Sequence, residues 1–299
     1  MSESARPGPI QTWVHAARVP TLAASLVPVL VGTALAVRDG GYRLFPAIAA
    51  LFGAVFIQIG TNFVNDLGDH ARGADTADRL GPKRALQMGW LTVSEVRAGA
   101  IVCFALATLA GAYLTVAAGW PVIAIGLASI AAGIAYTAGP WPLAYRGLGD
   151  IFVFLFFGVV AVCGAYFVQA RAIHPWTLLA SVPVGALSMA ILMVNNIRDV
   201  ETDRAAGKRT LAVRLGRDRA RAAYRSLLFT AFIAAFTLMG TGHASAWALL
   251  PLVTLPLALV EVRRVLTTED GPSLNRALVG TARLHALFGV LFAAGIAIG

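Results

Sequence analysis

The chain has 299 residues, of which 58% are hydrophobic and only 13% are charged. In an ordinary soluble domain about a quarter of the residues are charged, so this composition excludes a soluble domain. The net charge of +9 would suggest a nucleic-acid partner in a soluble protein, but in a membrane protein basic loops that face anionic lipid headgroups account for it, and no nucleic-acid partner is expected.

The charged residues gather in a few islands and leave long apolar runs between them. A spanning helix needs roughly 20 apolar residues, so the runs at 98–145 and 226–260 are each long enough for two spans. In chain order the predicted spans are 19–37, 44–65, 98–117, 122–140, 150–169, 175–197, 224–240, 245–262 and 282–298. The whole chain, 1–299, is therefore predicted to be a single all-α integral membrane domain, a bundle of nine transmembrane helices.

Basic residues test this count, because short cytoplasmic loops retain an excess of Lys and Arg. With the N-terminus inside, nine spans leave only Arg38, Arg43 and Arg171 of the 24 basic residues on the outer side. Dropping one mid-chain span would move the basic loop at 198–225 to the other face. We therefore predict a multi-pass protein of the cell (inner) membrane, with its N-terminus and acidic loops cytoplasmic and its C-terminus outside.

Two polar islands, at 62–89 and 195–216, begin where the second and sixth predicted spans end. In each, Asn and Asp recur every three or four residues, which places them on one helical face. The residues are Asn62, Asn65, Asp66 and Asp69 in the first island, and Asn195, Asn196, Asp199 and Asp203 in the second. This repetition indicates a weak internal duplication, which would bring both faces together over a central cavity open to the cytoplasmic side.

A metal ion is the predicted partner of these carboxylates. An Asp deep in a bilayer costs roughly 2.5–3.5 kcal/mol, and facing carboxylates repel each other. Mg²⁺ takes a few carboxylates and completes its octahedron with water and phosphate oxygens. Asp66, Asp69, Asp199 and Asp203 are thus the candidate Mg²⁺ ligands. The alternative is that they are ordinary polar residues at the membrane edge. The positive-inside rule explains basic residues in such loops, but it does not explain repeated Asn–Asp faces.

Basic and aromatic residues near the islands are candidates for substrate contacts. Lys and Arg bind phosphate or carboxylate well, although each is equally explained as a topology or lipid contact. The loop at 136–150 lies between the islands, and its Gly and Pro residues are also explained as shaping a tight turn. The candidates are Lys83, Arg84, Lys208 and Arg209 beside the islands, and Tyr136 and Arg146 in the loop.

The islands resemble the Asp-rich motifs of the UbiA superfamily of prenyltransferases, which are nine-helix bundles. Three segments are similar to the 1,4-dihydroxy-2-naphthoate polyprenyltransferases: GPKRALQMG, NNIRDVETDRAAGKRTL and YTAGPWPLAYRGLGD. The resemblance runs from about Gln58 to Gly216. It implies metal and diphosphate binding by Asp66, Asp69, Asp199 and Asp203, and extends to Asn62, Asn65, Asn196 and Asp75. One departure is that Asp75 is the next acidic residue after Asp69, where many members place the third Asp sooner.

The resemblance implies an enzyme that uses Mg²⁺ to transfer a polyprenyl group from prenyl diphosphate to 1,4-dihydroxy-2-naphthoate with loss of CO₂. Membrane lipids are its expected surroundings, and no obligate protein partner is expected. By extrapolation from position, either Lys83 or Arg84 orients the ring carboxylate, and Tyr136 stabilises the allylic cation. Three alternatives remain: another acceptor such as 4-hydroxybenzoate or homogentisate, an ion-coupled transporter, or a non-catalytic scaffold. A transporter predicts acidic residues near span centres, whereas these islands lie at span ends.

Overall fold

The computed structural model describes residues 7–73 and 80–299, and every regular element in them is helical. The first half contains α1 (Pro9–Ala17), η1 (Val19–Thr21), α2 (Ala23–Arg38), α3 (Leu44–Ala71), α4 (Val93–Ala118), α5 (Pro121–Thr137) and η2 (Ala144–Arg146). The second half contains α6 (Gly149–Val153), η3 (Phe154–Val160), α7 (Ala161–Ala170), α8 (Pro175–Arg198), α9 (Val200–Ala205), α10 (Leu211–Leu215), α11 (Arg217–Gly240), η4 (Ala246–Thr254), α12 (Leu255–Thr267) and α13 (Gly271–Ile298). The predicted all-α class is confirmed.

Six helices of the described residues are long and apolar enough to cross a membrane, and a seventh span results if the pair Pro9–Thr21 and Ala23–Arg38, bent by 53°, counts as one. All nine predicted spans are helical, but two do not pass this test. The span predicted at 122–140 is α5, which has only 17 residues. The span predicted at 245–262 is divided between η4 and α12, because Pro251 and Pro256 lack the amide hydrogen that a continuous helix needs.

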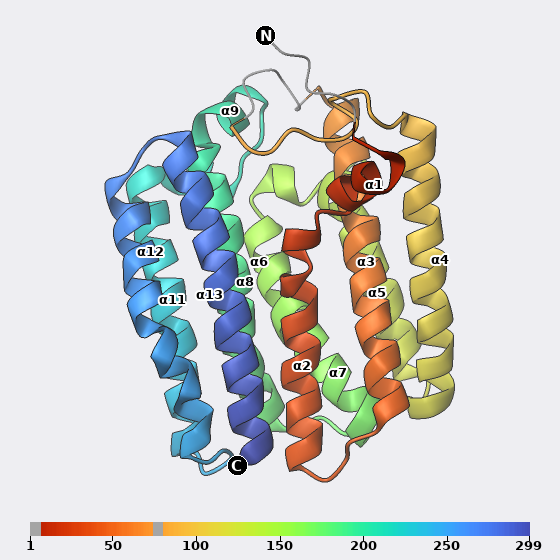
Figure 1. Cartoon of the computed structure of the whole chain (residues 1–299), viewed down its shortest axis with the longest axis vertical. Helices are drawn as coiled ribbons and strands as arrows, with labels where there is room; N and C mark the ends of the chain where they lie inside the picture. The colour runs from red at the N-terminus through yellow and green to blue at the C-terminus, as the bar shows by residue number, and fades with distance from the viewer. Residues whose placement is uncertain (1–6, 74–79) are drawn as a thin grey trace.

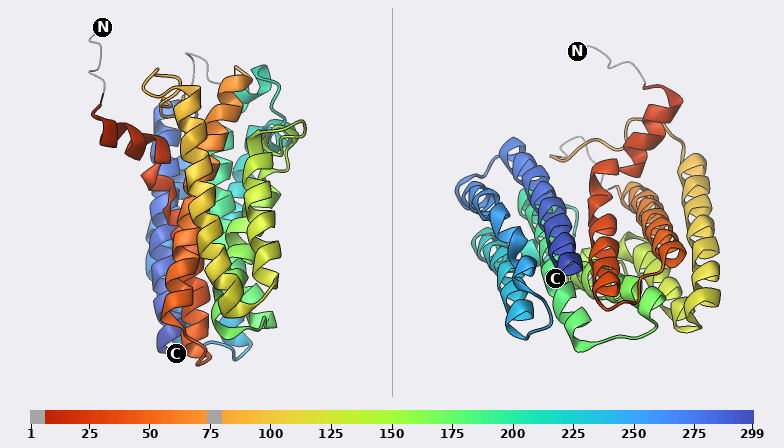
Figure 2. Two further views of the ribbon diagram at one scale, coloured as in Figure 1. Left: turned by 90° about the vertical axis from the view of Figure 1, so that its right-hand side faces the viewer. Right: turned by 60° about the horizontal axis from the view of Figure 1, so that its bottom comes forward.

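The long helices run side by side along the long axis of the molecule, while α1 lies across one end of the bundle (Figures 1 and 2). The C-terminal end of α3 and the short helix α9, which carry the two polar islands, lie at this same end. The C-terminus, Gly299, lies at the opposite end (Figure 1). Both acidic islands therefore face one end of the bundle.

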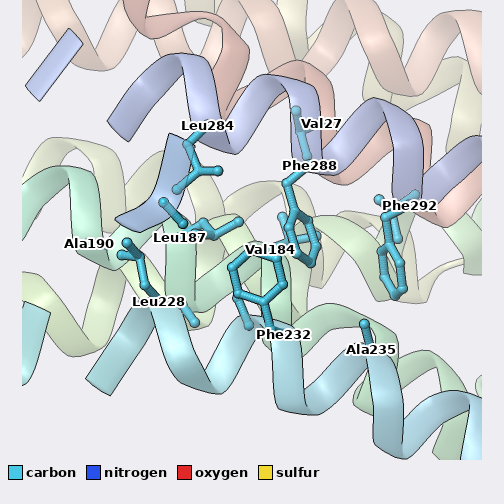
Figure 3. Packing of buried hydrophobic residues seen from close by; sticks show 14 of the residues in the cluster. Val27, Val184, Leu187, Ala190, Leu228, Phe232, Ala235, Leu284, Phe288 and Phe292 are labelled. Atoms are coloured by element: carbon cyan, nitrogen blue, oxygen red, sulfur yellow. The ribbon is translucent and has the colours of Figure 1, made fainter. Parts of the chain in front are cut away.

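The largest buried cluster joins α8, α11 and α13 to α2 (Figure 3). Phe232 of α11 meets Phe288 of α13 edge to face, with ring centroids 5.3 Å apart, and Leu187 of α8 is fully buried between these helices. Lipid tails are as apolar as these side chains, so close van der Waals packing rather than water exclusion stabilises the interface.

A π-helical segment, η3, interrupts the span formed by α6 and α7. It packs closely on α8: a Cβ at Gly158 would lie 2.6 Å from the Cα of Gly185, and a Cβ at Gly185 would lie 2.9 Å from the Phe154 carbonyl oxygen. Only glycine allows two backbones to approach so closely. These two glycines therefore fix the position of a wall of the pocket described below.

Candidate functional site

The first part of the first polar island, residues 62–71, forms the last turns of α3, where Asn62, Asp66 and Asp69 are all buried. The amide of Asn62 donates to the Ala17 carbonyl oxygen at 3.0 Å and to the Thr21 hydroxyl at 3.1 Å. Asn62 thus ties α3 to the corner between α1 and α2.

Asp66 pairs with two arginines. The Arg18 guanidinium binds Asp66 Oδ1, and Arg84 Nη1 lies 3.5 Å from the same oxygen. Arg18 has φ of +53°, a left-handed conformation uncommon outside glycine. This conformation allows the chain to turn sharply between α1 and η1 at the residue that reaches Asp66.

Asp69 is the most heavily contacted carboxylate of the site. Its Oδ2 accepts from Arg84 Nη2 at 2.7 Å, and its Oδ1 accepts from the Tyr145 hydroxyl at 2.8 Å and lies 3.3 Å from Lys208 Nζ. Burial and the Asp69 carboxylate raise the pKa of Tyr145 above its ordinary value, so this hydroxyl keeps its proton and donates. Contacts from three separate segments thus converge on one side chain.

The second island follows α8. Arg198 binds both oxygens of Asp199, at 2.7 and 2.5 Å, and donates to the Asn195 side-chain oxygen at 2.8 Å. Lys208 Nζ lies 4.0 Å from Asp203 Oδ1 and 3.3 Å from Asp69 Oδ1. One ammonium group thus lies between a carboxylate of each island.

A pocket of about 500 Å³ begins at these residues and continues into the bundle. Of the predicted site residues, those that line it are Asn62, Asn65, Asp69, Arg84, Tyr136, Asn195, Asn196, Asp199, Asp203 and Lys208. Asp69 and Ala50 both line it and lie 19 residues apart on α3, which corresponds to about 28 Å. Away from the islands the walls are mainly apolar and include Val29, Ile57, Leu114, Val122, Ile125, Phe156 and Phe157. The pocket thus joins a charged end to a long apolar portion.

Asp66 is buried against Arg18 and Arg84 and does not line the pocket, and four further predicted residues remain to be placed. Lys83 and Arg209 are exposed, and Arg146 stacks on Trp141 with its guanidinium carbon 3.6 Å from the ring centroid. None of these three side chains lines the pocket. Asp75 lies outside the described residues.

Three residues that contact the acidic side chains were not predicted from the sequence: Arg18, Tyr145 and Arg198. Tyr145 precedes the predicted Arg146, and Arg198 stands inside the motif NNIRD, so both were within motifs already singled out. Arg18 had no local signal, because its contact with Asp66 crosses 48 positions of sequence.

The donor chemistry at the charged end fits a Mg²⁺–diphosphate unit better than a bare ion. Within 7–73 and 80–299, no three His, Cys, Asp or Glu side chains are arranged to hold a metal by themselves. Burial, together with the nearby carboxylates of Asp199 and Asp69, raises the pKa of Asp203 to about 6 against the opposing effect of Lys208. Asp69, Asp199 and Asp203 carry oxygen ligands of the kind that a divalent cation takes, and Arg84 and Lys208 beside Asp69 suit phosphate oxygens.

Comparisons with known proteins identify the family of the chain. The model of the UbiA prenyltransferase family matches residues 25–296. The chain is 36% identical to the 1,4-dihydroxy-2-naphthoate octaprenyltransferase of Escherichia coli (strain K12), covering 96% of this chain and 95% of that protein. It is 38% identical to the enzyme of the same name from Mycobacterium tuberculosis, covering 96% and 97%.

Among solved structures, the fold is similar to that of a UbiA homolog from Archaeoglobus fulgidus bound to GPP and Mg²⁺. The TM-score is 0.68 at 19% identity, covering 96% of this chain and 100% of that chain. At this identity the likeness concerns the fold alone. With the family match over almost the whole length, these findings show that the chain belongs to the UbiA prenyltransferase family.

Proposed function

We propose that the protein transfers a polyprenyl group from a prenyl diphosphate to 1,4-dihydroxy-2-naphthoate, with loss of CO₂, to give demethylmenaquinol. The observation that carries the acceptor is the similarity, over about 95% of both chains, to enzymes named for this substrate. The prenyl diphosphate is supported as the donor because the pocket joins a charged end, suited to a diphosphate, to a long apolar portion, suited to a prenyl chain. An apolar chain gains about 0.8 kcal/mol for each CH₂ that leaves water, so a prenyl tail favours the apolar portion.

In this proposal the diphosphate lies at the charged end. Asp66, Asp69, Asp199 and Asp203 would hold Mg²⁺ together with the diphosphate. When bound, Mg²⁺ neutralises the charge that builds up on the leaving group. Arg84 and Lys208, which lie against Asp69 at 2.7 and 3.3 Å, donate to phosphate oxygens.

The rest of the pocket shapes and protects the reacting carbon. The apolar walls exclude water, which would otherwise capture the prenyl group. Aromatic faces near the charged end, Tyr136 and Phe152, stabilise positive charge on the allylic carbon through their π systems. Lys83 and Arg209 are exposed to solvent and Arg146 stacks on Trp141, so these three side chains have no direct role in the reaction that we propose. Asp66 differs from them because it contacts Arg18 and Arg84, which line the pocket.

We also propose nine crossings in a single domain, with α5 and the η4–α12 pair spanning the bilayer inside the bundle. The two islands and the mouth of the pocket then face the cytoplasm, and the C-terminus lies outside. Arg43 and Arg171 are exceptions to the excess of basic residues on the cytoplasmic side, and the structure gives a reason for them. Both donate to the Ala117 carbonyl oxygen at the C-terminal end of α4. That pairing gives these outer arginines a local structural role.

Acceptor selectivity tests the function. Purified protein is given Mg²⁺, a polyprenyl diphosphate and either 1,4-dihydroxy-2-naphthoate or 4-hydroxybenzoate, and prenylated products are identified by mass spectrometry. We expect a prenylated naphthoquinol and CO₂ with the first acceptor and no product with the second. Turnover with hydroxybenzoate alone would contradict the proposed acceptor while leaving the family assignment intact.

A further inference from the structure

One buried carboxylate beside the pocket takes no part in the contacts described so far. Asp150 lies in the first turn of α6 and is only 1% exposed. Its Oδ1 has no hydrogen-bond partner at normal geometry among the described residues, although the backbone amides of Asp150 and Leu211 also interact with the carboxylate. Burying an ionisable group in a membrane protein is expensive, and a buried polar atom without a partner calls for a reason.

The second carboxylate oxygen faces a residue of the pocket wall. Asn196 Nδ2 donates to Asp150 Oδ2 over a long contact of 3.5 Å, and Asn196 lines the pocket. An ionised carboxylate can only accept hydrogen bonds, whereas an amide has one end that donates and one that accepts. Asp150 therefore selects the orientation in which the NH₂ group of Asn196 faces the carboxylate. The carbonyl oxygen of Asn196 is then left for the pocket.

Tyr136 approaches the start of α6 as well. A Cβ at Gly149 would lie only 3.1 Å from the Tyr136 hydroxyl oxygen, so this glycine leaves room for the phenol. Tyr136 also lines the pocket, and a phenol at neutral pH can donate a hydrogen bond. The wall near Asp150 thus offers an oriented acceptor and a donor.

We propose that Asp150 is a positioning residue for the aromatic acceptor, holding Asn196 so that its carbonyl oxygen accepts from a ring hydroxyl while Tyr136 donates to an acceptor oxygen. This inference rests on the proposed function. A dihydroxyaromatic acid carries hydroxyl donors together with carboxylate oxygens, and so matches both groups. An ionised diphosphate has only accepting oxygens, so a carbonyl oxygen presented by Asn196 does not suit it.

Asp150→Asn tests the role of charge and orientation with almost no change in shape. The new amide can donate to Asn196, which is then free to turn its own NH₂ toward the pocket. We expect KM for the naphthoate to rise about tenfold, the usual effect of one lost hydrogen bond. KM for the prenyl diphosphate and the Mg²⁺ concentration for half-maximal rate stay unchanged. Asp150→Glu keeps a group that only accepts and should show a smaller rise.

Glu261→Gln is the matched control, because Glu261 is a carboxylate only 2% exposed that pairs with Arg264 on α12 and does not line the pocket. It should leave both KM values unchanged. Binding of the aromatic acid, measured by isothermal titration calorimetry without prenyl diphosphate, repeats the comparison without turnover. A wild-type protein that binds the acid but forms no product would refute the proposed function separately.

Two results would overturn the inference. A higher Mg²⁺ requirement in Asp150→Asn would mean that the Asn196 oxygen serves the metal rather than the acceptor. An unchanged naphthoate KM and unchanged binding, with only lower yield or lower kcat, would mean that Asp150 has a structural role alone.

Discussion

Asp69→Asn should lower kcat by roughly 10²–10³-fold, the loss typical when one charge-stabilising group is removed from an active site. Asp69 contacts Arg84 and Lys208 at 2.7 and 3.3 Å and accepts from Tyr145 at 2.8 Å. Asparagine can preserve the hydrogen bond from Tyr145, but it removes the negative charge that compensates the two cations and that, in the proposed function, binds Mg²⁺. The rate is measured as pyrophosphate release under saturating substrates.

A buried charge pair that loses one partner also destabilises the protein, so the variant must be shown to elute as a folded, monodisperse species in detergent. Asp218→Asn is the control, because Asp218 has a side chain that is 97% exposed on α11, and its replacement should leave the rate unchanged. The same loss is expected for Asp66→Asn and Asp199→Asn. A near-normal rate in the folded Asp69 variant would contradict its role as a metal ligand.

Gly158→Val should destabilise the fold. A Cβ at this position would lie 2.6 Å from the Cα of Gly185 and 3.2 Å from the Ser181 carbonyl oxygen, and backbone atoms cannot move aside as a flexible side chain can. Overpacking of this kind costs about 1–3 kcal/mol or more. We expect a lower Tm in detergent and a distorted pocket wall, since η3 supplies Phe156 and Phe157 to the pocket.

Gly126→Ala provides the comparison for this prediction. Gly126 is a helical glycine of α5 with no atom within 4 Å of an added Cβ. Alanine there should keep or raise the Tm, because glycine is the poorer helix former by about 1 kcal/mol. A Gly158 variant as stable as the Gly126 variant would show that η3 and α8 do not pack as described.

The sequence predicted the helices and polar islands well, because both are local patterns. Apolar runs mark where helices lie, and steps of three and four residues place Asp66 and Asp69 on one face of α3. The breaks were harder to predict: composition did not show that Pro251 and Pro256 divide one predicted span, nor that 17 residues of α5 fall short of a full one.

Contacts between distant segments could not be predicted from the pattern. Tyr145 reaches Asp69 across 76 positions, and neither residue carries a local sign of the other. Neighbours in sequence also diverge: Arg84 is buried against Asp69, while Lys83 beside it is exposed. Which of two adjacent basic residues faces the pocket depends on the path of the loop after α3, and spacing does not reveal that path.

In the proposed function, the two acidic islands together bind Mg²⁺ and a prenyl diphosphate, whose prenyl group is transferred to the naphthoate. Release of pyrophosphate and CO₂ by the purified protein, followed with Mg²⁺ and after chelation, tests it most directly. We expect equal amounts of both products with Mg²⁺, none after chelation, and recovery when Mg²⁺ is restored. Undiminished release after chelation would contradict the claim.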